Sequence, residues 1–434
     1  MILDVKINNY RFFKNETTLS FGADARTKRL LANASFVDGR YVNKSVAIYG
    51  ANNSGKSNLI SLFKALKLVF LGKDEFVFNR PFFKDKEETS IEIIYNTLDG
   101  NGWFKYCFTF DNVFRRFKKE ILSSMTYYPN GAPFEKLIFE KDTLNRVFTV
   151  FGEDYSKFLD VVRATLPLLF TIELDSGIFA SLREYKQSFI NLSNSIELVD
   201  MYNIPFSKTM DYMKNDDSYK KEFVQAFVKN ADLSIKDFKY HKNIINAEYY
   251  DNEAIKEKAL SEHNNHLDTY CLRTTYGDYS VPSLLFDSSG TKKIEGIASY
   301  IYEAIKEGKT LIIDELDNGL HYKLTRAIVS TFNNLSNKKG QLLFTAHDLL
   351  LVDCNNLMRK DQIYFLERNE ESASLFCLKK ATVSSGGPRE GADLIKRYNH
   401  GDFVDVPSPN FINLIIRMKK EEAQDNEWQW KKAL

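Results

Sequence analysis

The residues best suited to chemistry lie in the segment from Gly50 to Ser57, which reads Gly-Ala-Asn-Asn-Ser-Gly-Lys-Ser. An apolar run at 45–49 precedes this segment, and apolar residues at helical spacing follow it over 58–67. Between a strand and a helix, such glycines let successive backbone N–H groups turn toward phosphate oxygens, and the helix N-terminus adds partial positive charge. The segment therefore predicts a phosphate-binding loop for ATP with Mg²⁺.

The types of the loop residues indicate their roles. Lys56 is expected to reach the β- and γ-phosphates, and the Ser57 hydroxyl is expected to coordinate Mg²⁺. The residues expected to contact the nucleotide in this segment are Gly50, Asn53, Ser54, Gly55, Lys56, Ser57 and Asn58. The alternative is a glycine turn that binds nothing, and the flanking strand and helix argue against it.

A second group of candidate residues follows a buried strand over 310–313. Asp314 at the end of this strand is expected to hold Mg²⁺ through water, opposite Ser57. Glu315 is expected to project toward the γ-phosphate, where a carboxylate can polarise the attacking water. An apolar run followed by Asp-Glu is common by itself, so the prediction depends on the upstream phosphate loop.

His347 ends the next predicted parallel strand, which reads Leu-Phe-Thr-Ala-His over 343–347. A lone histidine is more often a capping or core residue. Ligands, however, bind at the carboxyl ends of parallel strands, where Asp314 and Glu315 also lie. His347 is therefore predicted to sense the γ-phosphate.

A second candidate anion site lies in the turn that opens the helix ending near Glu307. Its expected contact residues are Ser288, Ser289, Gly290 and Thr291, followed by Lys292. The alternative is an ordinary helix N-cap.

The order of these elements resembles the ABC-type ATPases, a class that covers transporters and the heads of SMC and DNA-repair proteins. Within this class the chain resembles the single-chain bacterial ATPases of the OLD-like, RloA/AbiL-type group, which is linked to phage defence. The resemblance rests on Ile-Asn-Asn-Tyr-Arg-Phe-Phe-Lys at 7–14, Ser-Ser-Gly-Thr-Lys-Lys at 288–293 and the Tyr-x-x-Gly-x-Phe-x-x-x-Pro element at 398–407. The Leu-Ser-Gly-Gly-Gln sequence of transporters is absent, and no residue can be assigned to a glutamine loop.

This resemblance implies a homo-oligomer, a dimer or larger, in which ATP is sandwiched between two subunits. One subunit would supply the phosphate loop and the other Ser288–Thr291. It also implies an antiviral, abortive-infection role in which a separate effector protein, encoded nearby, is controlled by nucleotide state. The alternatives are a DNA-processing ATPase that acts on nucleic acid directly, and a scaffold that binds ATP without turnover. Both catalytic carboxylates, Asp314 and Glu315, argue against the scaffold.

Composition limits the partners of the chain. Lys and Arg number 59 and Asp and Glu number 58, so the net charge of +1 provides no overall attraction to nucleic acid. This balance does not exclude a local basic groove. No apolar run approaches the length of a membrane span, and the N-terminus lacks the apolar block of a signal peptide. The four cysteines are widely separated, which favours reduced core thiols over structural zinc. We therefore expect a cytoplasmic protein.

The expected fold is α/β, a P-loop NTPase of ABC-ATPase type with a parallel core sheet, an antiparallel β lobe and a compact helical insertion. The expected parts are an ATPase head divided into 1–153 and 236–407, a helical insertion at 154–235 and a tail helix at 408–434. The lobe is predicted from β-type segments over 89–151, and the insertion from helical patterns at Tyr155–Thr165 and Tyr219–Val228.

Two segments receive a structural interpretation. Two basic residues flank Phe117 on each side over 115–119, and we interpret this segment as a solvated hairpin edge in preference to a nucleic-acid contact. The residues after His347 lack a strand followed by Asp-x-Asp, so no nuclease is expected on this chain.

Overall fold

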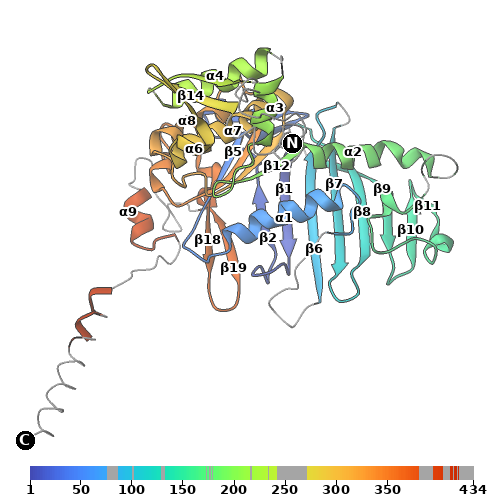
Figure 1. Cartoon of the computed structure of the whole chain (residues 1–434). Helices are drawn as coiled ribbons and strands as arrows, with labels where there is room; N and C mark the ends of the chain where they lie inside the picture. Colours follow the sequence, from blue (N-terminus) through green and yellow to red (C-terminus); the bar gives the residue numbers. More distant parts are fainter. Residues whose placement is uncertain are drawn as a thin grey trace, which may run out of the picture.

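A computed structural model provides the structure of the chain. It describes residues 1–75, 87–99, 102–128, 132–172, 174, 177, 179–215, 218–232, 234–241, 271–380, 394–403, 411–413, 415–417 and 419. Two large sheets run through the molecule, with helices between them and on the far side of one of them (Figure 1).

The central sheet has six strands in the order β12-β16-β17-β5-β18-β19. Their bounds are β12 Ile196–Asp200, β16 Thr310–Asp314, β17 Gln341–Ala346, β5 Ser45–Tyr49, β18 Ile363–Arg368 and β19 Ala373–Cys377. The first five strands are parallel, and β19 pairs antiparallel with β18. The predicted parallel core sheet is confirmed.

Residues alternate between the two faces of this sheet, as the strand period of two requires. Val46 and Ile48 of β5 face one hydrophobic core, and Ala47 and Tyr49 face another. The first core also contains the apolar face of helix α1 (Lys56–Val69), and the second contains α7 (Ser289–Glu307) and α8 (Tyr322–Phe332). Helices therefore cover both faces, which explains why the core strands are apolar throughout.

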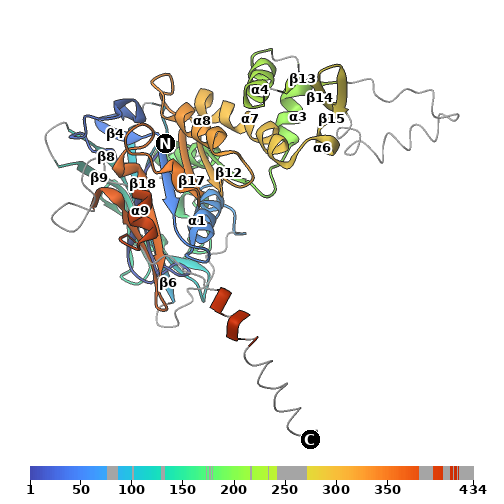
Figure 2. The ribbon, with the colours of Figure 1, turned by 90° about the vertical axis from the view of Figure 1, so that its left-hand side faces the viewer.

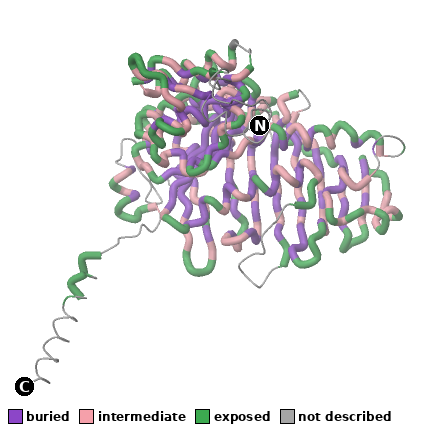
Figure 3. The backbone as a smooth tube through the Cα atoms, in the orientation of Figure 1, coloured by how far each residue is buried: buried purple, intermediate pink, exposed green. Residues whose placement is uncertain are grey.

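The second sheet, which we call the β lobe, has eight antiparallel strands in the order β11-β10-β9-β8-β7-β6-β1-β2. Their bounds are β1 Ile2–Asn8, β2 Thr17–Ser20, β6 Glu88–Asn96, β7 Trp103–Asp111, β8 Arg116–Thr126, β9 Phe134–Asp142, β10 Val147–Val150 and β11 Glu153–Asp154. Buried residues follow the strands of both sheets, and exposed residues lie at the outer turns (Figure 3). The predicted β lobe is confirmed, and the chain's first two strands belong to it.

The predicted hairpin at 115–119 is present, since β7 and β8 pair antiparallel, but its position at a sheet edge is wrong, because β8 lies inside the lobe between β7 and β9. Lys118 pairs with Asp111 at 3.1 Å, and Lys119 pairs with Glu140 at 3.0 Å. These lysines neutralise cross-strand carboxylates and protect no open edge.

The predicted helical insertion at 154–235 divides into two parts. Helix α2 (Arg183–Ser195) leads directly into β12, which pairs with β16 in the central sheet. Residues 155–165 hold only the short 3₁₀ helix Ser156–Phe158, so the predicted helix there is wrong. Tyr155 and Phe158 instead pack against the ring of Phe179. Tertiary packing of aromatic side chains outweighs the local helical pattern.

The second part of the insertion forms a small lobe with the residues that follow it. Helices α3 (Ser207–Lys214) and α4 (Ser218–Ala231) pack on α7, and the predicted helix at 219–228 is confirmed. Strands β13 Ile235–Tyr240, β14 Leu272–Tyr276 and β15 Tyr279–Pro282 and helix α6 Ser283–Phe286 complete this lobe, which projects from the core beside α7 (Figure 2).

The remaining elements are short. They are β3 Ala34–Val37, β4 Arg40–Asn43, α9 Leu394–Asn399 and the 3₁₀ helices Leu31–Asn33, Leu168–Phe170, Ala180–Leu182, Leu349–Leu351, Lys360–Gln362 and Leu378–Lys380. The predicted tail helix over 408–434 lies mostly outside the described residues, as do 404–407 of the element at 398–407.

All four cysteines are free thiols. Cys271 and Cys377 are buried, and Cys107 and Cys354 are half-buried. Among the helices that the structure describes, none combines the length and apolarity that crossing a membrane requires.

Candidate functional site

The phosphate loop, Gly50–Ser57, connects β5 to α1, as the sequence predicts. Gly55 precedes the helix with a φ of 111°, a conformation that favours glycine. At Gly50, a Cβ atom would lie 2.4 Å from the carbonyl oxygen of Leu366, so only glycine fits beside β18. The backbone of the loop is therefore held in a form that other residues could not adopt.

Lys56 is the buried cation of this loop. Its Nζ donates hydrogen bonds to the carbonyl oxygens of Gly50 at 2.7 Å and Ala51 at 3.0 Å. Burial lowers the pKa of Lys56, and the negative charges of Glu315 and Asp314 oppose this effect. The Ser54 hydroxyl is also buried, and it has no hydrogen-bond partner among the described residues. An ammonium and an unpaired hydroxyl in one loop fit the oxygens of a phosphate group.

Two arginines support the loop from outside. Arg11 donates to the Asn58 side chain at 2.6 Å. Arg368, at the end of β18, donates to the Asn53 side chain at 3.2 Å, and its guanidinium lies 3.5 Å from the centre of the Phe12 ring. The sequence analysis did not assign either arginine a role. Arg368 could have been found, because it ends a parallel strand at the ligand-binding edge of the sheet.

Asp314 ends β16 at the same edge of the sheet. The Thr345 hydroxyl of β17 donates to its carboxylate at 2.6 Å and accepts a hydrogen bond from the Glu315 N–H at 2.8 Å. One threonine therefore fixes both carboxylate residues relative to β17. Thr345 is a further residue that the sequence analysis did not identify.

Glu315 has an unusual backbone and two side-chain partners. Its φ is 56°, in the left-handed region that non-glycine residues rarely adopt. Asn318 donates to its carboxylate at 3.2 Å. The exposed Tyr202, just after β12, hydrogen-bonds the same carboxylate, which is the main cause of the raised pKa of Tyr202. The strained backbone and these two partners fix where the carboxylate of Glu315 points.

His347 lies just beyond β17 and is exposed. Its backbone N–H donates to Asp317 at 2.8 Å, and the N–H of Asp348 donates to the same carboxylate oxygen at 2.6 Å. The structure brings His347 to the predicted edge, next to the loop that follows Glu315. Its role as a γ-phosphate sensor stays a prediction.

The turn Ser288–Thr291 lies elsewhere, at the start of α7. Ser288 is the N-cap, and its hydroxyl accepts a hydrogen bond from the Thr291 N–H at 3.1 Å. Ser288 and Ser289 are exposed, and within the described residues no hydrogen bond or ion pair joins 288–291 to residues 50–58. The geometry of an N-cap is therefore present, and the predicted second anion site is separate from the phosphate loop within one chain.

A polar connection nevertheless joins this turn to Glu315. Lys293, in the first turns of α7, donates to both the backbone and the side-chain oxygen of Asn318, each at 2.8 Å. Asn318 in turn donates to Glu315. Lys293 and Asn318 therefore connect the amino end of α7 to the Glu315 carboxylate through hydrogen bonds.

Comparison with known proteins gives one family and several solved structures. A family model described as an AAA domain, putative AbiEii toxin of a type IV TA system, matches residues 164–353, which hold Asp314, Glu315 and His347 but not the phosphate loop. No curated protein matches the chain.

SMC heads are among the solved structures that are similar to this chain. The SMC head domain from Thermotoga maritima is 12% identical to this chain, with 87% of this chain and 98% of that chain covered and a TM-score of 0.41. An SMC head bound to the C-winged helix domain of ScpA is 12% identical, with coverages of 88% and 99% and a TM-score of 0.45. One with an extended coiled coil, bound to the C-terminal domain of ScpA derived from Pyrococcus furiosus, is 15% identical, with coverages of 88% and 97% and a TM-score of 0.38.

The chain has the α/β fold of a P-loop NTPase with a mixed core sheet. Its phosphate loop follows β5, its Asp-Glu pair follows β16, and the central sheet is mixed because β19 runs against the other strands. This fold implies nucleotide binding, typically with Mg²⁺.

Proposed function

We propose that the chain is a Mg²⁺-dependent ATPase that acts as a molecular switch. The observation that carries this proposal is the meeting of opposite charges at one sheet edge, where the loop with the buried Lys56 follows β5, and Asp314 and Glu315 lie at the end of the parallel strand β16. A cation for phosphate oxygens, a carboxylate for a metal and a carboxylate for water are the parts that ATP hydrolysis needs.

Each residue has a defined task in this proposal. Lys56 exchanges its two carbonyl partners for phosphate oxygens, and the phosphate loop N–H groups hold the same oxygens. The Ser57 hydroxyl and the Asp314 carboxylate would hold Mg²⁺, which neutralises phosphate charge when bound. Asp314 keeps its orientation through Thr345, and Glu315 accepts a proton from the attacking water.

We further propose that the working site is shared between two copies of the chain. The turn Ser288–Thr291 makes no hydrogen bond or ion pair with the phosphate loop within the described part of one chain, but it presents exposed hydroxyls at a helix N-terminus. A second copy could place this turn against the nucleotide. The hydrogen bonds from Lys293 to Asn318 and from Asn318 to Glu315 would then couple binding of the turn to the position of the Glu315 carboxylate.

The biological role that we propose is regulation of a defence system, with a separate effector controlled by nucleotide state. The name of the matching family, a putative toxin of a type IV TA system, supports a defence link. The OLD-like resemblance of 7–14 and 288–293 supports it as well. Direct action on DNA is the competing proposal, and strong stimulation of hydrolysis by DNA would favour it.

Mixing two inactive variants tests the shared site. Lys56→Ala loses the phosphate cation, and Ser288→Arg blocks the turn, so each variant alone should be nearly inactive. In a mixture some pairs combine one intact phosphate loop with one intact turn, and activity should return to about a quarter of wild type, since one site in four is intact on random pairing. A mixture no more active than its components, or a fully active monomer by ultracentrifugation, would refute the shared site.

A further inference from the structure

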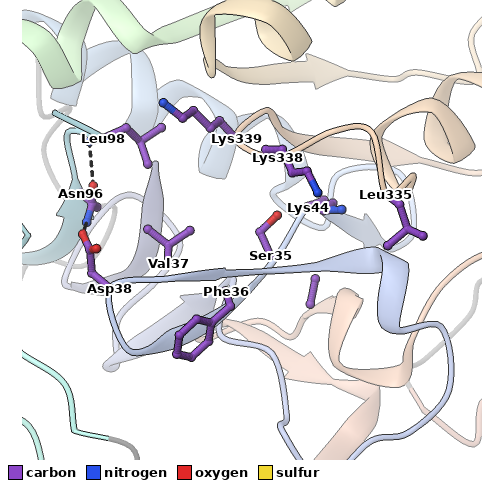
Figure 4. Close-up of a pocket in the computed structure, with 11 residues that line it drawn as sticks. Ser35, Phe36, Val37, Asp38, Lys44, Asn96, Leu98, Leu335, Lys338 and Lys339 are labelled. Carbon is purple, nitrogen blue, oxygen red and sulfur yellow. Dashed lines mark hydrogen bonds between the residues drawn. The ribbon is translucent and has the colours of Figure 1, made fainter. Parts of the chain in front are cut away.

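A pocket of about 510 Å³ lies far from the proposed ATP site. It is lined by the whole of β3, by Lys44, by the end of β6 and by the loop after α8 (Figure 4). Lys44 immediately precedes β5, whereas the phosphate loop follows it. With a rise of about 3.3 Å per residue, the strand separates the two places by roughly 16 Å.

Three lysines line this pocket: Lys44, Lys338 and Lys339. The ends of Lys44 and Lys338 lie near each other, and Lys339 extends from the same loop as Lys338 in the other direction, toward Leu98 (Figure 4). No ion pair joins any of the three to a carboxylate within the described part of the chain. Asp38, the acidic residue of the lining, is engaged by the Asn96 side chain at 2.7 Å.

Lys44 is the buried lysine of this pocket, and it lies near the positive charge of Lys338. The residue is 3% exposed, and its Nζ donates to the carbonyl oxygens of Ala32 and Asn334, each at 2.7 Å. Burial, together with the positive charge of Lys338, lowers the pKa of Lys44 to about 8. An ammonium has three N–H donors, so Lys44 keeps one donor beyond its two carbonyl partners. An anion in the pocket would relieve the repulsion between the two lysines.

We propose that this pocket is a second ligand site, which binds a small organic molecule through a terminal phosphate. A phosphate monoester carries close to two negative charges at neutral pH, so one group can neutralise both Lys44 and Lys338. A single carboxylate or phosphodiester would neutralise one of them. Val37, Leu98 and Leu335 provide apolar walls for the organic part, and the volume is that of a small-molecule site.

Isothermal titration calorimetry on the full chain tests this site. The background is Lys56→Ala, which removes phosphate binding by the loop. The probes are inorganic pyrophosphate, AMP as a monoester and 3′,5′-cyclic AMP as a diester. We expect pyrophosphate or AMP to bind, and cyclic AMP to bind at least about tenfold more weakly than AMP because it carries half the charge.

Variants then locate the binding. Lys338 and Lys339 are exposed, so replacing both with Ala should leave the fold intact and weaken binding by at least about tenfold. The matched control is Lys379→Ala with Lys380→Ala, an adjacent exposed lysine pair outside the pocket, which should change affinity less than twofold. The proposal is overturned if neither pyrophosphate nor AMP binds, if the Lys338 and Lys339 changes have no effect, or if cyclic AMP binds as well as AMP.

Discussion

The two edges of the central sheet are built in opposite ways. At the amino edge, the buried Gln341 side chain is engaged through both its oxygen and its nitrogen: it accepts from the Ile2 N–H at 2.6 Å and donates to the Ile2 carbonyl at 2.8 Å. At the carboxyl edge, Lys56 donates to carbonyl oxygens of its own loop, the buried Ser54 hydroxyl is unpaired among the described residues, and Glu315 has a strained backbone.

This contrast separates groups that hold the fold from groups that are ready for a ligand. Removing a buried, fully paired group leaves its partners unsatisfied, so it costs stability. Removing a group that has unused hydrogen-bonding capacity costs little stability but lowers activity. We therefore expect substitution of Gln341 at the amino edge to change unfolding, and substitutions in the proposed ATP site at the carboxyl edge to change turnover.

The largest effect is expected at the carboxyl edge. Glu315→Gln should lower kcat by about 10²–10⁴-fold, because the general base for water is lost, while ATP binding stays near that of wild type. ATP turnover and equilibrium binding measure the two quantities. Glu371→Gln, a change in an exposed turn, is the control and should be neutral. Turnover within a few-fold of wild type would contradict the assignment of Glu315.

The amino edge should respond in stability instead. Gln341→Ala leaves the Ile2 N–H and carbonyl unpaired in the interior, so the free energy of unfolding should fall by about 2–5 kcal/mol. Chemical denaturation measures this loss, and kcat of the folded fraction should be unchanged. Gln187→Ala, on the exposed side of α2, should cost less than about 0.5 kcal/mol. A large fall in kcat of Gln341→Ala with no loss of stability would contradict this distinction between the two edges.

A smaller effect should reveal whether Tyr202 positions Glu315. Tyr202→Phe removes one hydrogen bond to the carboxylate, so kcat should fall by about two- to tenfold with KM unchanged. The same change should have no further effect in a Glu315→Gln background, because the two residues act together. Tyr279→Phe, an equally exposed tyrosine on β15, is the control. A raised KM, or additive effects in the double variant, would count against this role.

Local sequence predicted the parts of the fold whose signals are local. The strand, glycine loop and helix around Lys56 lie within one short segment, and the β lobe follows consecutive hairpins. Strand β12 was missed because Ile-Glu-Leu-Val-Asp is short and lies between helical patterns. Its identity as a core strand depends on pairing with β16, more than a hundred residues away along the chain.

The site was predicted to a similar degree. The structure places Lys56, Asp314, Glu315 and His347 at the expected edge, because each follows a predicted strand, and their roles stay predictions. Thr345 was not predicted. Its hydroxyl contacts both Asp314 and Glu315 because β16 and β17 are neighbours in the sheet, which the sequence alone does not show. The lysine pocket could not be predicted either, because Lys44 and Lys338 meet only in the folded chain.

The order of strands in the central sheet also bears on synthesis of the chain. Strand β5 has β17 on one side and β18 on the other, and both come from residues 341–368. On the ribosome, β5 therefore emerges long before either neighbour, as an apolar strand with two open edges. Such strands are prone to wrong pairing during folding, so a nascent chain that has not passed residue 368 should depend on chaperones and be unable to bind ATP.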